Sequence, residues 1–181
     1  GEVMRRFEDL CRIDDGSKLT ITVVGGGPTG VEMAGALAEL KRGPLKLDHP
    51  SSAQRIHIRL IEAGPDLLPS LHKKLSNKTR KDLETLGVKV ALNTKVAKVH
   101  PDRIDISNGE SIESEITIWA AGVTGEPVMK KLSLPILNGR IEVEPTLQVV
   151  NYPHIWAIGD IAGAKGKDGR FLPMVAPVAM Q

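Results

Sequence analysis

The sequence is poor in the residues that define several large classes of protein. Its single cysteine, Cys11, can form neither an internal disulfide nor a multi-thiolate metal site, so we expect no metal and a reducing compartment. No stretch approaches the roughly 20 apolar residues of a membrane-spanning helix. Lys and Arg number 24 against 22 Asp and Glu, which gives no basic excess to favour a nucleic-acid partner. We therefore expect a soluble chain.

The length indicates slightly more than one domain. The chain has 181 residues, against roughly 150 for an average domain. Hydrophobic residues make up 41%, enough to bury a core, while only 3% are aromatic. The 18 glycines follow no collagen-like period, so they indicate many tight loops between short elements.

The first two thirds of the chain alternate between strand and helix patterns. Residues 1–16 are typical of an amphipathic helix that leads into the domain. We then expect two strand–helix units, with a helix that Ser70 caps and that presents Leu71, Leu75, Leu83 and Leu86 on one face. The predicted elements are strand 19–24, helix 29–40, a surface excursion over 42–54, strand 56–64, the helix from Ser70 to Leu86, and strand 88–92.

Short strands follow between residues 95 and 117, with a hairpin turn at Asn108–Gly109, and a last apolar strand covers 116–122. The fold predicted for residues 17–125 is therefore an α/β, Rossmann-like βαβ domain that binds NAD(H) and carries an antiparallel β-meander. Residues 126–181 are rich in proline, with short apolar runs at 141–143 and 155–158, and show no self-contained core.

A glycine motif stands directly between the first strand and its helix. Gly25, Gly27 and Gly30 have the spacing of a dinucleotide-binding turn. The first permits the tight turn, the second lets the backbone approach a pyrophosphate, and the third lets the helix pack on the strand while its N-terminal N–H groups face the anion. We predict that the whole turn contacts the cofactor, including Gly26, Pro28 and Thr29.

An acidic residue at the end of the second strand completes this pattern. Glu62 follows the apolar run there, and a carboxylate at this place accepts hydrogen bonds from the adenosine ribose hydroxyls. Because it would repel a 2′-phosphate, Glu62 favours NAD(H) over NADP(H). A solvated glutamate at a strand end is the alternative interpretation.

Three other candidates are ambiguous taken singly. Glu32 is equally well an acid that suits the helix dipole. Ala121 and Gly122 put small residues where a strand would meet a cofactor, but small residues also serve close packing. Gly159 and Asp160 follow an apolar run, where an aspartate is more often a helix cap.

Taken in order, several segments resemble the pyridine nucleotide-disulfide oxidoreductase superfamily and, within it, the type II NADH dehydrogenases. The segments are VVGGGPTGVEMAGALAEL, LIEAGPDLLPS, LETLGVKV, IWAAGV, PTLQVVNYPHIWAIGDIAG and VAPVAMQ. In that family the NADH domain is inserted in an FAD domain that has its own glycine motif. Since this chain has one such motif, the resemblance implies a fragment, in which residues 126–181 are the C-terminal segment of a partial FAD domain.

The resemblance also implies roles for individual residues. Glu32 matches a glutamate near the nicotinamide and the flavin, which makes it the candidate catalytic residue, and Asp160 with Gly159 matches the flavin-binding aspartate. Ala176 and Gln181 match the quinone region, although Pro177 replaces one glutamine of its pattern. The implied reaction is hydride transfer from NADH to FAD and then reduction of a quinone, with the flavin carrying the chemistry.

Alternatives remain open. The chain could instead derive from a ferredoxin, nitrite or disulfide reductase of the same superfamily, or be a non-catalytic NAD(H)-sensing module. The resemblance implies a parent bound peripherally to the cytoplasmic or equivalent face of an energy-transducing membrane, with the fragment itself nearly inactive. Residues 126–181 either pack on the preceding domain or pair between chains in a homodimer.

Overall fold

The computed structural model describes residues 1–12, 16–122 and 131–174. The chain separates into two compact units, Gly1–Gly122 and Val123–Gln181. The domain bounds expected from the sequence, 17–125 and 126–181, stay predictions.

A parallel sheet forms the centre of the first unit, with strand order β3-β2-β1-β7. Its strands are β1 (Leu19–Val24), β2 (Ile56–Ile61), β3 (Val88–Ala91) and β7 (Ile116–Trp119). Along β1, Leu19 pairs with Ile56 and Ile21 pairs with Ile116. Strands β2 and β3 lie on one side of β1, and β7 lies on the other. The strand order therefore reverses at β1, which creates a switch point at the carboxyl ends of the strands. The α/β prediction is confirmed.

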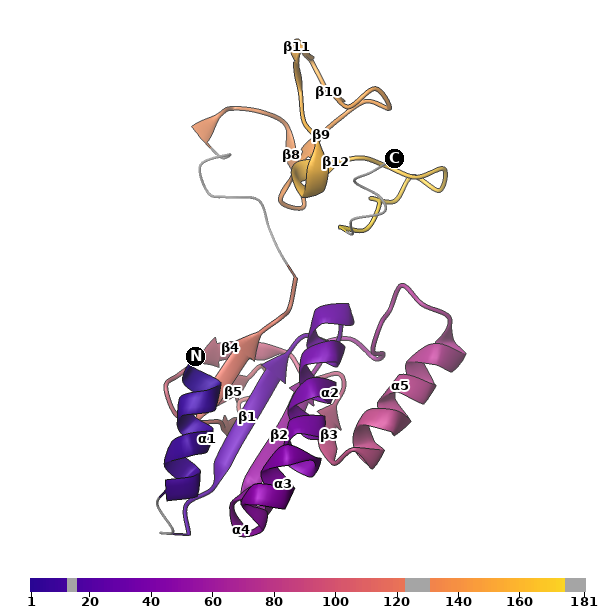
Figure 1. Cartoon of the computed structure of the whole chain (residues 1–181). Helices are drawn as coiled ribbons and strands as arrows, with labels where there is room; N and C mark the ends of the chain where they lie inside the picture. The colour runs from indigo at the N-terminus through magenta and orange to yellow at the C-terminus, as the bar shows by residue number, and fades with distance from the viewer. Residues whose placement is uncertain (13–15, 123–130, 175–181) are drawn as a thin grey trace. The chain divides into compact units, whose positions relative to one another are not determined.

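Helices cover one face of this sheet (Figure 1). They are α1 (Glu2–Arg12), α2 (Pro28–Arg42) and α5 (Lys73–Thr85). Alternate strand residues such as Ile21, Ile58 and Leu60 are buried against helix residues such as Phe7 and Leu37. Apolar residues that recur every two positions in the strands and about every 3.6 positions in the helices thus pack into one hydrophobic core.

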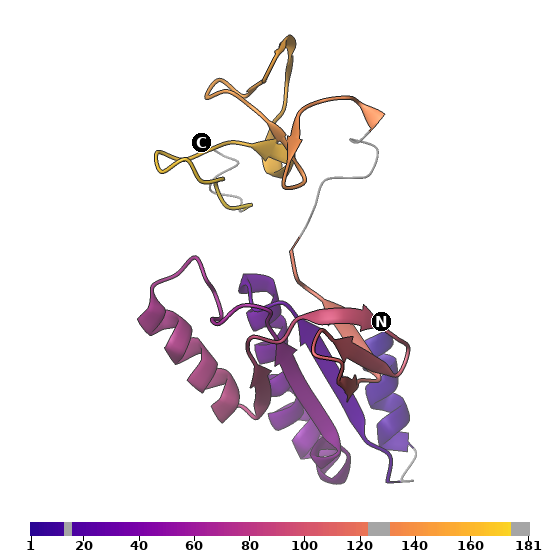
Figure 2. The ribbon, with the colours of Figure 1, turned by 180° about the vertical axis from the view of Figure 1, so that it is seen from behind.

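The antiparallel meander lies over the opposite face, which Figure 2 shows from behind. Its strands are β4 (Val96–Val99), β5 (Arg103–Ile106) and β6 (Ser111–Glu113). The predicted turn between β5 and β6 forms, with Gly109 at φ +91° and the Asn108 side chain accepting from the Glu110 N–H. Val24, Ile104 and Ile106 make a second, small apolar cluster beneath it.

The surface excursion predicted over 42–54 is mostly exposed and contains two short helices, α3 (Pro44–Asp48) and α4 (Pro50–Gln54). Each starts with a proline, whose fixed φ suits the first helical turn, and each is too short to show an apolar period.

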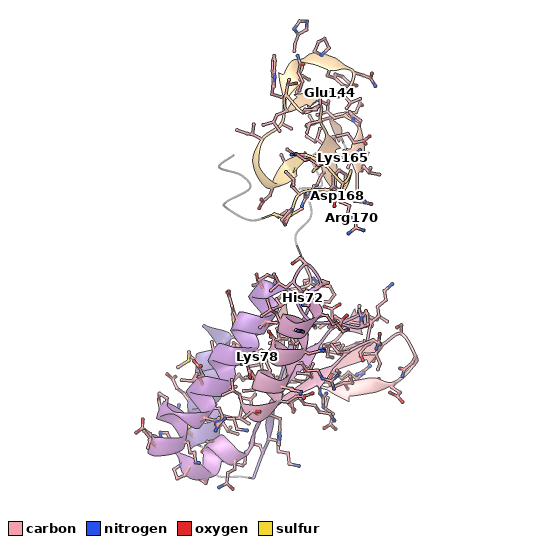
Figure 3. The ribbon with its side chains drawn as sticks, turned by 90° about the vertical axis from the view of Figure 1, so that its right-hand side faces the viewer. His72, Lys78, Glu144, Lys165, Asp168 and Arg170 are labelled. Carbon is pink, nitrogen blue, oxygen red and sulfur yellow. The ribbon has the colours of Figure 1, made fainter. Side chains whose placement is uncertain are left out.

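The start of α5 differs from the prediction. His72, not Ser70, is its N-cap, because His72 Nδ1 accepts from the Lys74 N–H at 3.2 Å (Figure 3). Leu83 is buried as expected, whereas Leu71 and Leu75 are exposed, so the predicted apolar face covers only the C-terminal part of the helix.

The second unit consists of short strands around a small core. The strands are β8 (Ile136–Leu137), β9 (Arg140–Glu142), β10 (Gln148–Val149), β11 (Tyr152–Trp156) and β12 (Ala162–Gly163). Ile141, Val149, Ala157 and Ala162 are buried together. The expectation of no self-contained core is therefore wrong, since strands of two to five residues carry too little periodicity to reveal one.

Candidate dinucleotide-binding site

A cleft of about 500 Å³ lies at the carboxyl ends of the parallel strands in the first unit. Its walls come from the turn after β1, the end of β2, the loop after β3, and the end of β7. Open α/β sheets bind ligands at this switch point, because the loops diverge there and leave a crevice. Its lining includes eight of the nine residues predicted to contact NAD(H): Gly25, Gly26, Gly27, Pro28, Thr29, Glu62, Ala121 and Gly122.

Two of the motif glycines are required by the fold itself. Gly25 has φ +114°, and a Cβ there would lie 2.5 Å from the Ala120 carbonyl oxygen. A Cβ on Gly30 would overlap with the Gly25 carbonyl oxygen, so only glycine lets α2 start this close to β1. These contacts agree with the turn and packing roles expected from the spacing.

Gly27 differs from its neighbours. A Cβ at this position would meet no heavy atom within 4 Å, and its φ of −73° is open to any residue. Gly27 is also the N-cap of α2 and provides no side-chain acceptor for the first N–H groups of the helix. The protein alone therefore gives no reason for glycine here, whereas a ligand phosphate that approaches the backbone would.

Glu62 lies at the edge of the cleft and is half-buried. Its Oε2 accepts from the Gly26 N–H and its Oε1 accepts from the Gly64 N–H, each at 2.6 Å. The carboxylate thus connects the end of β2 to the glycine turn after β1. Each oxygen has a further lone pair with which it can accept a ribose hydroxyl.

The position of Glu62 explains why residue 26 is a glycine, a requirement that the sequence pattern did not reveal. A Cβ at Gly26 would lie 2.7 Å from the Leu67 Cδ2 and 3.0 Å from the Glu62 Cβ. Glycine at this position allows the carboxylate and the turn to approach each other.

Glu32 is not part of the cleft lining. It lies on the exposed side of α2, beyond the first turn of the helix. Its catalytic role stays a prediction from the resemblance.

Sequence reasoning missed part of the cleft wall. Thr94 and Lys95 reach it from the loop after β3, Val96 from the start of β4, Pro69 from the loop before α5, and Trp119 from the end of β7. These residues share a position near the carboxyl edge of the parallel sheet, at a strand end or in a loop there. That position is the signal that could have assigned them to the cleft.

A second cleft, of about 780 Å³, lies within the second unit. Gly159, at φ +73°, and Asp160 line it from a single 3₁₀ turn, Gly159–Ile161, and both are exposed. Arg140 and Lys165 also line it, and both cations lie within 5.7 Å of the Phe171 ring centroid (Figure 3 labels Lys165). Both residues predicted for the quinone region, Ala176 and Gln181, lie outside the described residues.

Fold and cleft together define a class: a Rossmann-like α/β protein of the nucleotide-binding type. Residues 2–181 match the family model described as pyridine nucleotide-disulphide oxidoreductase, and the chain belongs to this family.

Named relatives agree with this assignment. The chain is 35% identical to the type II NADH:quinone oxidoreductase Ndh of Mycobacterium tuberculosis, over 93% of its own length and 40% of the relative. It is 33% identical to the internal alternative NAD(P)H-ubiquinone oxidoreductase A1 of Solanum tuberosum mitochondria, over 89% of its length and 32% of the relative. The chain therefore spans about two fifths or less of these relatives.

Solved structures show the same likeness. NDH2 from Plasmodium falciparum in complex with NADH matches 90% of this chain and 37% of its own, with a TM-score of 0.77 and 27% identity. A ferredoxin reductase from Rhodopseudomonas palustris matches with a TM-score of 0.66 at 19% identity, over 94% of this chain and 39% of its own, which supports the fold alone.

Proposed function

We propose that this chain is the NADH-binding part of an FAD-dependent NADH:quinone oxidoreductase. The observation that carries the proposal is the cleft, in which a glycine turn, a helix N-terminus and the Glu62 carboxylate meet at the switch point of a parallel sheet. The likeness to type II NADH:quinone oxidoreductases and to NDH2 in complex with NADH supports the choice of ligand.

Each part of the cleft suits one part of NADH. The Gly25–Gly27 backbone and the first N–H groups of α2 would hold the pyrophosphate, and the open space around Gly27 gives it room. Glu62 would accept hydrogen bonds from the adenosine ribose. Ala121 and Gly122, which are small and exposed, would leave space for the other half of the dinucleotide.

The second unit fits part of a flavin site. Asp160 is an exposed carboxylate on the wall of a cleft, and its neighbour Gly159 has a left-handed backbone that presents it there. We propose that Asp160 accepts hydrogen bonds from the ribityl chain of FAD. FAD, when bound, supplies the two-electron chemistry that links NADH to the quinone, and the protein residues align and shield the reactants.

The acceptor and the setting of the parent enzyme are proposals from the resemblance. We propose Glu32 as the residue near the nicotinamide, Ala176 and Gln181 as part of the quinone region, and peripheral attachment to the cytoplasmic or equivalent face of an energy-transducing membrane. Pairing of two chains through residues 126–181 is proposed in addition. Among the helices of the described residues, none has the length and apolarity that a membrane crossing needs.

Direct titration of this chain with NADH and NADPH tests the binding function. We expect NADH to bind more tightly than NADPH, and Glu62→Arg to shift the preference toward NADPH because it replaces a repelling charge with an attracting one. Since arginine also leaves the Gly26 and Gly64 N–H groups without their acceptor, Glu62→Gln is the matched control. It keeps one acceptor oxygen and should weaken NADH without favouring NADPH. Unchanged NADH binding in both variants would contradict the role of Glu62.

The enzyme function needs the full-length protein. We expect that protein to purify with FAD and to reduce a soluble quinone analogue with NADH, whereas the 181-residue chain should bind NADH weakly and reduce no quinone. A full-length protein without flavin would overturn the oxidoreductase proposal and favour an NAD(H)-sensing module. Flavin with ferredoxin or disulfide reduction, and no quinone reduction, would favour the other branches of the superfamily.

A further inference from the structure

Trp119 is an exposed aromatic residue in a chain that has few aromatics. It is the last residue of β7 and is 58% exposed, although the neighbouring strand residue Ile118 is packed against the core. Packing of the described unit therefore does not account for a large apolar side chain at this position.

Its position places it in the nucleotide cleft. Trp119 lines the cleft and pairs in register with Val24, the residue directly before the glycine turn. Successive strand residues point to opposite faces, so Trp119 shares the face of Val24 rather than that of the helices. The indole is thus an apolar wall beside the start of the proposed pyrophosphate site.

The strand order decides which half of the dinucleotide faces this wall. Glu62 follows β2 and Trp119 ends β7, and β1 with its glycine turn lies between these two strands. If Glu62 holds the adenosine ribose, as the proposed function requires, the adenosine half lies over β2 and the pyrophosphate over β1. The nicotinamide half then extends over the end of β7.

We propose that the Trp119 indole contacts the nicotinamide half of NADH and fixes the plane of its ring. Offset stacking of aromatic rings stabilises a complex beyond what the buried area alone contributes. The residues that follow Trp119, Ala120 to Gly122, are small and leave room for a second ring beside it. An apolar wall also keeps water from one side of the pyridine ring, which favours hydride transfer over side reactions.

The second tryptophan of the chain can be replaced so that the emission of Trp119 is observed alone. Trp156 has nearly the same exposure, 56%, but belongs to the second unit and does not line the first cleft. Trp156→Phe leaves Trp119 as the sole tryptophan, and Trp119→Phe leaves Trp156. Tryptophan emission overlaps the absorption of the reduced nicotinamide, so energy transfer to bound NADH reports their proximity.

In the Trp156→Phe protein we expect NADH to quench most of the tryptophan emission and to gain sensitised nicotinamide emission. In the Trp119→Phe protein we expect NADH affinity to stay within about twofold, because phenylalanine still stacks. Weak quenching of the Trp119 emission by bound NADH in the Trp156→Phe protein would overturn the proposal.

Affinity for half-ligands separates this inference from the binding function itself. We expect Trp119→Ala to weaken NADH about tenfold, as about 1.4 kcal/mol of lost stacking requires, and ADP-ribose less than about twofold. An equal loss for both ligands, or no loss, contradicts the assignment of Trp119 to the nicotinamide half. If the unchanged protein binds neither ligand, the proposed function fails instead. Thermal unfolding shows whether the variant is folded, and Trp119→Leu replaces Trp119→Ala if it is not.

Discussion

Gly30 and Gly25 lie so close that a Cβ on Gly30 would overlap with the Gly25 carbonyl oxygen. The contact joins the first turn of α2 to the end of β1, and it exists before any nucleotide binds. The glycine motif therefore serves the fold at two of its positions, Gly25 and Gly30, and the ligand at Gly27, and substitutions can separate the two roles.

Gly30→Ala should destabilise the first unit by about 3 kcal/mol or more, because α2 must move away from β1 to admit the methyl group. Gly35→Ala is the control on the same helix, where the new Cβ would lie 3.9 Å from Leu83 Cδ2, an ordinary contact. It should raise the free energy of unfolding by about 0.5–1 kcal/mol, as alanine does in a helix interior. Thermal or urea unfolding measures both, and equal stability of the two variants would contradict the packing role of Gly30.

Gly27→Ala should have the opposite profile. Because nothing lies within 4 Å of the new Cβ, we expect the free energy of unfolding to change by less than about 1 kcal/mol, the usual effect at an N-cap. NADH affinity should fall by about tenfold or more, since the methyl group enters the pyrophosphate site. Titration with NADH and unfolding curves on one preparation test this, and unchanged affinity would remove Gly27 from the site.

The cap of α5 can be tested against the residue that the sequence favoured. His72→Ser should stabilise the protein by about 0.5–1 kcal/mol, because serine is a better N-cap than histidine. Ser70→Ala should change stability by less than about 0.5 kcal/mol, as at an ordinary surface position. If Ser70→Ala costs more than His72→Ala, the cap assignment is wrong.

The meander should lose stability in acid through Asp105. Hydrogen bonds from the Ser111 hydroxyl and the His100 ring, each at 2.7 Å, lower the pKa of Asp105 below its ordinary value. A carboxyl whose pKa is lower in the folded state stabilises the fold above its unfolded pKa, and this contribution disappears as the pH falls through the folded pKa.

Asp105→Asn should therefore lower the melting temperature at neutral pH, with a difference from the unchanged protein that shrinks in acid and at high salt. Asp102→Asn is the control, since the Asp102 carboxylate lies 3.4 Å from Arg103 at the surface and is 75% exposed. A pH dependence shared by both variants would show that Asp105 has no special part.

Local patterns predicted what depends on local residues. The run from Leu19 to Val24 matches β1 residue for residue, and the glycine spacing identified the turn that follows. Thr94, Lys95 and Trp119 could not be assigned to the cleft in this way, because their contribution comes from the pairing of β3 and β7 with strands distant in the sequence. The Glu62–Gly26 hydrogen bond, across 36 positions, is equally invisible to a linear pattern.

The small cluster beneath the meander has a consequence for hydrogen exchange. Among the residues that the structure describes, Val24, Ile104 and Ile106 are the buried members of this cluster, which is much smaller than the core on the helix face. Amides of β4, β5 and β6 should thus exchange through local opening at a lower free energy than those of β1 and β2. Because the loop that enters the meander, at Thr94 to Val96, also lines the cleft, bound NADH should slow this opening. Protection factors in the meander would then report occupancy of a site formed mainly by other strands.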